Sequence, residues 1–400
     1  MMKKYFLSLC CIAAISGCGN TILSSSGSTD DTAVLSTNAD ICLGNGITID
    51  YRFDNARVDD CVIYDSRVTL TITPENQPIN NSPWYAFKVS SEAKRDIDVV
   101  INYVGGDHRY SPKKSVDGKY WQPLTFKSTK KQLRFSVTAS PTPLFIAGQE
   151  LVTNQAYDTW MHSHKQSPDV VVSSLGTSTK GRNIGMMEIT QPNNKEWLVV
   201  LGRMHPPEVT GALALFPFVD NMLSNKGREF RQRFNILVIP NVNPDGVADG
   251  NWRHNAKGVD LNRDWKAFKQ VESRLIRDKL NAIVADGGKI VFALDFHSTH
   301  KDVFYTMPSD YGLNPPLLVE HWLAQLAAEM PQFKVRQQPG TSPNKGVFKQ
   351  YIADTFNVHA ITYEMGDNTN RAVINEVAIN ANDTLMMQLL DTPANKFYGQ

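Results

Sequence analysis

Two segments of the chain carry side chains of the types that bind metal ions in proteins. The first is His205-Pro206-Pro207-Glu208, in which an imidazole and a carboxylate stand three residues apart where a strand-like run gives way to a helical one. The second is His297, which follows the apolar run KIVFALDF. Two histidines and one carboxylate form a ligand set that zinc favours, and hydrolytic zinc sites keep a fourth position for water. Taken singly, a Glu at a helix start and a His at a strand end are common structural features, so the prediction of one zinc ion per chain rests on the set.

The segment between these two motifs carries groups suited to anions. Asn243-Pro244-Asp245-Gly246 is followed by Arg253 and then by Asn262-Arg263, within the run GVDLNRDW. Arginine is the side chain best shaped to hold a carboxylate through two hydrogen bonds. The Asn-Pro-Asp-Gly run also suits a turn in any protein, so the arginines carry the functional interpretation.

A carboxylate near the end of the chain completes the candidate chemistry. Glu364 stands in the run TYEMGD, directly after a short apolar strand-like segment. A carboxylate in that position can take a proton from an attacking water molecule as a general base. A Glu that ends a strand and faces solvent is the alternative interpretation.

The elements that must position these residues alternate between strand and helix from about residue 150 onward. Strands are predicted at 196–202, 234–240, 289–296 and 360–363, and helices at 208–223, 267–285 and 316–329. In open α/β sheets, functional residues gather at the carboxyl ends of the strands. We therefore predict an α/β catalytic domain with a mixed sheet over residues 150–400.

The segment before residue 150 has a different sequence pattern. Residues 41–149 contain short β-prone runs between turn signals, at 67–72, 84–89, 97–104 and 133–137, with no long helical period. This pattern predicts a small antiparallel β-sandwich domain.

The first 40 residues are typical of an export signal and a tether. Lys3 and Lys4 precede an apolar run at 5–15, which is too short to span a bilayer, and small residues then lead into Cys18. The run resembles a bacterial lipobox, which implies that residues 1–17 are a lipoprotein signal peptide and that Cys18 carries a membrane-anchoring lipid. Ordinary signal cleavage nearby is the alternative. Residues 18–40 are rich in small polar residues and predict a flexible tether.

The cysteine positions limit the chemistry that this protein can perform. Cys42 and Cys61 are the two cysteines left after the signal and the lipidation site, and in an oxidising compartment we expect a disulfide, worth about 3 kcal/mol, rather than two thiols. The absence of cysteine beyond Cys61 excludes a thiol nucleophile in the catalytic domain.

With 41 basic and 40 acidic residues, the chain shows no sign of nucleic-acid binding. The expected location is the bacterial cell envelope, and Gly19 in place of Asp after the lipobox cysteine favours the outer membrane, facing the periplasm.

In order and context, the four motifs resemble the zinc carboxypeptidase family. That family has HxxE, then NPDG, WR and DxNR, then a distant His and a Glu on a strand. The resemblance covers about residues 150–370 and implies zinc ligands at His205, Glu208 and His297.

The same resemblance implies further roles. Arg253 would stabilise the oxyanion, and Asn262 with Arg263 would hold the terminal carboxylate of the substrate. Glu364 would be the general base and later the acid, and Asp260 would orient His205 from behind.

A narrower resemblance concerns the β-rich segment. The runs WYAF at 84–87, HRYSP at 108–112 and the segment 117–121 are similar to the β-sandwich that precedes the catalytic domain in cytosolic-type carboxypeptidases. One departure concerns the substrate-capping tyrosine of the digestive members. Residues 340–350 contain no tyrosine, and Tyr351 is the nearest one.

These observations predict a zinc metallocarboxypeptidase that removes the C-terminal residue of a peptide. An amidase or carboxypeptidase of the same fold, acting on peptidoglycan stem peptides, is the rival enzyme. A non-catalytic binding module on a degenerate peptidase fold is the alternative from a different class.

Overall fold

The computed structural model describes residues 34–35, 41–76 and 81–398, and the chain from Val34 onward forms one compact unit. The predicted signal peptide, Cys18 and most of the predicted tether lie outside the described residues. Within the tether, Val34–Leu35 form the short strand β1, which pairs with β4. None of the helices in the described ranges is long and apolar enough to cross a membrane.

The β-rich part consists of two six-stranded sheets. The first sheet has, in spatial order, β1, β4 (Asp60–Tyr64), β5 (Arg67–Ile72), β7 (Arg95–Tyr103), β11 (Gln132–Ala139) and β10 (Phe126–Ser128). The second has β2 (Ile41–Gly44), β3 (Ile47–Asp50), β6 (Ala86–Ser91), β12 (Leu144–Ala147), β8 (Lys113–Ser115) and β9 (Gln122–Pro123). The predicted antiparallel β region is therefore present, with one parallel pair, β5 with β7.

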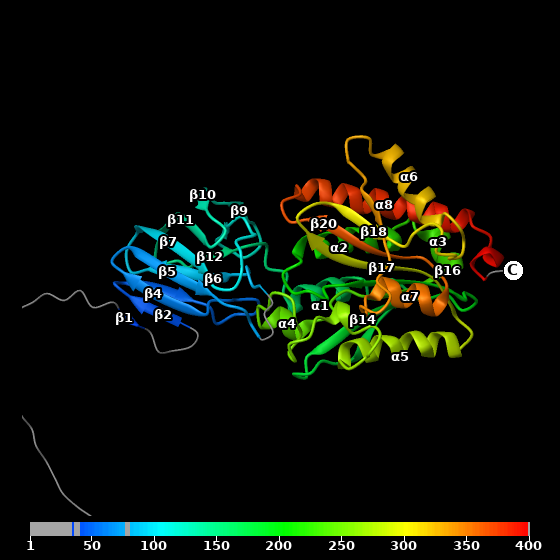
Figure 1. Cartoon of the computed structure of the whole chain (residues 1–400), viewed down its shortest axis with the longest axis horizontal. Coiled ribbons are helices and arrows are strands. Elements are labelled where there is room, and N and C mark those ends of the chain that lie inside the picture. The colour runs from blue at the N-terminus through cyan, green and yellow to red at the C-terminus, as the bar shows by residue number, and fades with distance from the viewer. Residues whose placement is uncertain (1–33, 36–40, 77–80, 399–400) are drawn as a thin grey trace, which may run out of the picture. The chain divides into compact units, whose positions relative to one another are not determined.

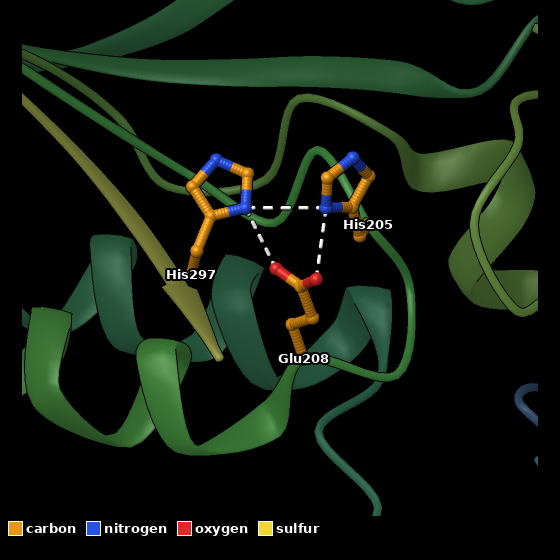
Figure 2. Close-up of side chains that lie close together, drawn as sticks. All are labelled: His205, Glu208 and His297. Atoms are coloured by element: carbon orange, nitrogen blue, oxygen red, sulfur yellow. Dashed lines mark hydrogen bonds and ion pairs between the residues drawn. The ribbon is translucent and has the colours of Figure 1, made fainter. Parts of the chain in front are cut away.

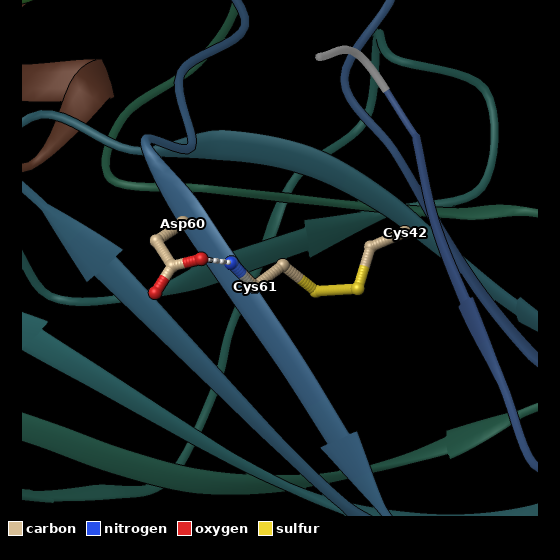
Figure 3. The surroundings of a disulfide bond; sticks show 3 residues. All are labelled: Cys42, Asp60 and Cys61. Atoms are coloured by element: carbon tan, nitrogen blue, oxygen red, sulfur yellow. Dashed lines mark hydrogen bonds between the residues drawn. A yellow bond between two sulfur atoms is a disulfide. The ribbon is translucent and has the colours of Figure 1, made fainter. Parts of the chain in front are cut away.

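The core of this part follows from strand alternation. In β5 and β11 every second residue is buried, as expected for strands with one face in a core. A disulfide joins Cys42 on β2 to Cys61 on β4, and so links the two sheets through the core (Figure 3). The predicted pairing of these cysteines is thus present in the structure.

The second half is built on an eight-stranded mixed sheet. Its strands, in spatial order, are β13 (Val170–Thr177), β14 (Asn183–Ile189), β16 (Phe234–Ile239), β15 (Glu196–Gly202), β17 (Lys289–Thr299), β20 (Ala360–Gly366), β18 (Val303–Thr306) and β19 (Gln337–Pro339). The central strands β16, β15, β17 and β20 run parallel. They are almost continuously buried because helices cover both faces of the sheet.

Helices pack on the two faces of this sheet as separate layers (Figure 1). One layer contains α2 (Val209–Leu223), α6 (Leu318–Glu329) and α8 (Arg371–Asp391), whose apolar residues share one core. The other contains α5 (Val271–Ala285) and α7 (Phe348–Phe356), which share a second core. The shorter helices are α1 (Asn154–Ser163), α3 (Arg228–Arg233), α4 (Pro244–Ala248), η1 (Leu261–Arg263) and η2 (Ala394–Phe397).

The predicted fold class is confirmed, with one shift that matters for the site. β17 continues three residues beyond the predicted end at 296, and β20 three residues beyond 363. His297 and Glu364 therefore lie inside strands, and they are direct neighbours in the parallel register of β17 and β20. Paired side chains in a parallel ladder point to the same face, so this register brings the two groups together.

Candidate metal centre and active-site cleft

A cleft of about 310 Å³ opens at the carboxyl ends of the central strands. It is lined by seven of the residues that the sequence singled out: His205, Glu208, Arg253, Asn262, Arg263, His297 and Glu364. They come from positions up to 159 residues apart, counted from His205 to Glu364. The strand ends thus gather the four motifs into one site, as the topology of an α/β sheet predicts.

Three of these side chains, His205, Glu208 and His297, converge on one point (Figure 2). His205 Nδ1 lies 2.9 Å from Glu208 Oε1, and His297 Nδ1 lies 2.7 Å from Glu208 Oε2. The two Nδ1 atoms are 3.2 Å apart, and all three residues are buried. One ligand atom from each lies within 4.8 Å of the others, as a single metal ion requires.

A carboxylate stands behind each imidazole. Nε2 of His205 donates to Oδ1 of Asp260 at 2.9 Å, which is the contact predicted for Asp260. Nε2 of His297 donates to Oδ2 of Asp295 at 2.5 Å, a contact the sequence analysis missed. Asp295 and His297 are two residues apart on β17, so strand alternation places both on the same face. Metal-binding histidines regularly have such a carboxylate on the second nitrogen.

These contacts fit a metal ion chemically. With both Nε2 atoms donating to carboxylates, the neutral imidazoles turn two Nδ1 lone pairs toward each other at 3.2 Å, and a cation between them removes the repulsion. Burial opposes protonation of His297, but Asp295 and Glu208 outweigh it and raise the pKa of His297. The site therefore attracts positive charge, and a divalent cation supplies it without protonating the ligands.

The loop before α2 is held in an unusual conformation. Arg203 has a positive φ of 56°, a left-handed conformation that a non-glycine residue adopts only when its surroundings hold it there. Its buried guanidinium donates to the carbonyl of Pro206 and to the Tyr157 hydroxyl, at 2.6 and 2.9 Å. These bonds fix the turn that aims His205 and Glu208 at one point.

Close packing of α2 against β17 completes the triad. A Cβ at Gly211, in the first turn of α2, would come within 2.5 Å of the carbonyl oxygen of His297. Only glycine permits this approach, and the Gly211 amide then donates to Ser298 Oγ at 2.8 Å. The helix that begins next to Glu208 is thereby locked to the strand that carries His297.

The loop that bears Arg253 is held from both parts of the chain. Arg253 Nε donates to Asp260 Oδ2 at 2.7 Å, on the same carboxylate that orients His205. Oε1 of Glu75, in the β-rich part, accepts from the backbone amides of Trp252, Arg253 and His254 at 3.1, 3.1 and 3.4 Å. This contact joins residues about 178 positions apart, so no local sequence signal indicates it.

Asn262 and Arg263 lie beside the triad on η1. Asn262 Nδ2 is 3.4 Å from His297 Nε2, and its Oδ1 accepts from the amide of Phe348 at 2.9 Å. Arg263 keeps 47% of its side chain exposed, and its Nη1 donates to the Asn262 carbonyl at 2.6 Å. One amide group and one exposed guanidinium therefore line the same side of the cleft.

Glu364 is partly buried, and one of its two carboxylate oxygens forms no hydrogen bond with the described residues. Its Oε2 has no hydrogen-bond partner among the described residues, although it is inaccessible to bulk solvent. Burial and the neighbouring Glu208 carboxylate raise the pKa of Glu364 to about 7. A carboxylate of this kind holds a proton more readily than an exposed one, which is the property of a general base that works near neutral pH.

Residues with no predicted role also line the cleft, among them Arg109, Tyr305 and Lys349. Lys349 is buried, and its ammonium donates to the carbonyls of Thr306 and Gly340 at 2.8 and 2.5 Å. Tyr351, the nearest tyrosine in sequence to the expected substrate-capping position, instead stacks on Trp265 and does not line the cleft. Tyr305 reaches the cleft from β18, a strand that the sequence analysis did not predict.

Comparison with known protein families supports a zinc site in this cleft. The profile of the family described as zinc carboxypeptidase matches residues 157–388, more than half of the chain. The chain therefore belongs to the zinc carboxypeptidase family, as its motifs predicted, and it has the His-Glu-His cluster through which zinc is expected to bind.

Particular relatives show the same relationship. Cytosolic carboxypeptidase 2 of Xenopus tropicalis is 28% identical over 215 residues, which cover 47% of this chain but only 22% of that protein. An uncharacterized protein of Zymomonas mobilis is 23% identical over 63% of this chain and 67% of its own length. The chain thus corresponds to about a fifth of the cytosolic carboxypeptidase.

Solved structures extend the likeness to both parts of the chain. A metallo-carboxypeptidase from Burkholderia cenocepacia matches with a TM-score of 0.75 at 18% identity, over 86% of this chain and 99% of its own. A metallo-carboxypeptidase from Pseudomonas aeruginosa, in complex with (2-guanidinoethylmercapto)succinic acid, matches with a TM-score of 0.69 at 21% identity, over 85% and 98%. At these identities the likeness establishes the shared fold, including its β-rich part.

Proposed function

We propose that this protein is a zinc-dependent metallocarboxypeptidase that releases the C-terminal residue of peptides. The observation that carries the proposal is the convergence of the His205–Glu208–His297 triad, the Glu364 carboxylate and the polar groups of Arg253, Asn262 and Arg263 on a single cleft. His205, Glu208 and His297 would hold one zinc ion. Bound zinc supplies Lewis acidity, which polarises the scissile carbonyl and lowers the pKa of water.

Glu364 acts as the general base in this proposal. Its free Oε2 takes a proton from the attacking water, and the raised pKa of Glu364 makes the carboxylate a competent acceptor. The same carboxyl group then donates the proton to the leaving amine. Both transfers use one side chain, so no second acid is needed.

Arg253 stabilises the charge that develops on the carbonyl oxygen. Asp260 holds its Nε, while the rest of the guanidinium lines the cleft. A donor fixed before the reaction stabilises an oxyanion without a cost of reorganisation. The Glu75 contact to the Arg253 loop serves the same end.

Asn262 and Arg263 determine which bond is cut. They stand on one side of the triad, and we assign to them the terminal carboxylate of the substrate. A substrate anchored by its carboxyl terminus presents only its last peptide bond to the triad. Exopeptidase action follows from that placement.

The wall next to this clamp suggests a preference for the terminal residue. Lys349 follows Phe348, whose amide binds Asn262, and burial lowers the pKa of Lys349 to about 8. The ammonium is still charged at neutral pH and forms no ion pair with a carboxylate in the described part of the chain. We expect acidic terminal side chains to be released faster than basic ones.

The test uses the purified zinc-loaded protein and a mixed library of L-peptides and muropeptides, with products identified by mass spectrometry. We expect chelator-sensitive loss of a single C-terminal residue from L-peptides. Matched peptides with an amidated C-terminus are the control, and we expect them to be cleaved at least about 100-fold more slowly, since they lack the charge that the clamp holds.

Two outcomes would redirect the proposal. Equal rates for free and amidated termini would exclude the carboxylate clamp. Cleavage confined to muropeptides would favour the peptidoglycan enzyme of the same fold.

A further inference from the structure

Arg109 belongs to the β-rich part of the chain but lines the cleft of the catalytic part. It lies in the segment between β7 and β8. Its Nε donates to Asp367 Oδ2 at 2.7 Å and its Nη2 to Asp367 Oδ1 at 3.1 Å, while Nη2 also donates to the Ser298 carbonyl at 3.2 Å. The last contact is to the residue directly after His297. A side chain from one part of the molecule is therefore fixed beside the metal triad of the other.

The guanidinium is held in one orientation. Besides its bidentate pair with Asp367, it lies over the rings of Trp252 and Tyr110, at 4.8 and 5.2 Å from their centres. The Arg109 side chain is only 13% exposed. None of the hydrogen bonds among the described residues uses its Nη1, so one end of a preorganised donor remains available.

The contacts of Arg109 place it away from the carboxylate clamp. Asn262 bonds to Phe348, and the neighbouring Lys349 bonds to Gly340, so the clamp and the terminal wall form one continuous side of the cleft. Arg109 bonds to Ser298 and Asp367, which follow the triad residue His297 and the base Glu364 on β17 and just after β20. The clamp and Arg109 are therefore bonded to different segments of the cleft wall, and the Arg109 contacts adjoin the triad and Glu364.

We propose that Arg109 binds the main chain of the peptide upstream of the scissile bond, by donating a hydrogen bond from Nη1 to a backbone carbonyl oxygen. This inference rests on the proposed function, in which Asn262 and Arg263 take the terminal carboxylate and Arg109, bonded to another segment of the same cleft, remains for the upstream part of the peptide. The β-rich part then completes the substrate site. Its contact to the peptide main chain is independent of side-chain identity.

A purely structural ion pair is the competing explanation, and the chain offers a matched control. Arg371 also joins the two parts, through Nη2 to Gln149 at 2.7 Å, and it binds Glu150 at their boundary through Nε and Nη2 at 2.9 and 2.7 Å. Arg371 does not line the cleft. A loss that arises from weakened contact between the parts should therefore appear in both arginine variants.

The experiment compares zinc-loaded wild type, Arg109→Gln, Arg109→Lys and Arg371→Gln on peptides of two to five residues that share their last two residues. In the wild type we expect kcat/KM to rise with length. Arg109→Gln should reduce kcat/KM for the pentapeptide about 10-fold or more and for the dipeptide less than about 3-fold, because only the longer chain reaches the lost donor. Arg109→Lys should restore part of the loss, and Arg371→Gln should keep the wild-type dependence on length.

Binding of the pentapeptide to zinc-loaded Glu364→Gln, with and without Arg109→Gln, gives a second readout that requires no turnover. We expect weaker binding of the pentapeptide when Arg109 is absent. A loss that is equal at all lengths, or one that Arg371→Gln reproduces, overturns the inference and leaves the proposed function intact. A wild type that cleaves none of the peptides overturns both.

Discussion

The β-rich part and the catalytic part of this chain bury different kinds of groups. The core between the two β-sheets is formed by apolar side chains and one disulfide. The catalytic part has apolar cores on both faces of its sheet, but at the strand ends it also buries His205, Glu208, Asp295 and His297. Buried charges destabilise a fold unless they are paired or bind a metal ion. Among the described residues, the buried acidic, basic and histidine side chains all belong to the catalytic part, and these four are grouped at one point.

Two residues of the β-rich part cross this division, Glu75 and Arg109. Arg109 lines the cleft beside Ser298, and Glu75 holds the backbone of the Arg253 loop. The comparison predicts that changes in the cleft alter turnover with little effect on stability, and that changes in the β core do the reverse.

Replacement of Glu364, the proposed general base, should have the largest effect. Glu364→Gln is expected to lower kcat by about 10³-fold, since it removes a proton acceptor while keeping the shape of the side chain. Zinc content and the thermal unfolding midpoint should stay at the wild-type values, because Glu364 is not one of the triad. Metal analysis and kinetics on the same preparation check both statements. Loss of zinc from this variant would show that Glu364 is a ligand rather than the base.

The carboxylates behind the histidines should govern zinc affinity. Asp260→Asn and Asp295→Asn are each expected to weaken zinc binding about 10- to 100-fold, because the amide no longer supports the imidazole tautomer and its basicity. Competition with a chromophoric chelator measures the change.

Asp264→Asn is the matched control for these two variants. Asp264 is also buried, and it accepts hydrogen bonds from Gln270 N and Ser273 Oγ at 2.8 and 2.5 Å. It has no contact with the triad among its hydrogen bonds in the described residues. It should lose stability and keep zinc affinity. A similar loss of affinity in all three variants would mean that any buried carboxylate nearby has the same effect.

The dependence of kcat/KM on pH should report the protonation of Glu364. Burial and Glu208 raise the pKa of Glu364 to about 7, above its usual 4.5, and the carboxylate is the active form. Turnover is therefore lost as the pH falls through that pKa. Because bound zinc favours the charged form, we expect the acidic limb of kcat/KM between 4.5 and about 7. Zinc occupancy must be measured at each pH, and a limb that follows loss of zinc would contradict this assignment.

The disulfide should have the smallest effect on turnover. Replacing Cys42 and Cys61 together with alanine is expected to lower the free energy of unfolding by about 3 kcal/mol, because the closed loop no longer restricts the unfolded chain. At a temperature where the variant is folded, kcat/KM should remain within about twofold of wild type. Denaturant unfolding and kinetics test the two halves of the statement. A large loss of turnover in the folded variant would show that the β core does more than support the fold.

Local patterns in the amino-acid sequence were enough to predict most of the elements and the candidate chemistry of this protein. Strand alternation, helix starts and turn residues placed most of the elements, and the order of His205, Glu208, Arg253, His297 and Glu364 indicated the family. The disulfide was predicted because Cys42 and Cys61 are the two cysteines left after the signal and the lipidation site. Each of these signals is contained within a few neighbouring residues or in their order along the chain, which is why they could be read without coordinates.

The groups that support those residues from behind and from the side became visible in the folded chain, because they come from distant segments. Asp295 could have been suspected from its two-residue spacing to His297, but the partner of its carboxylate depends on the final register of β17. Arg109 meets Asp367 across 258 residues, and Glu75 meets the Arg253 loop across 178. Such contacts follow from how the β-rich part packs against the catalytic part. That packing is the sum of many weak long-range interactions, and no local pattern encodes it.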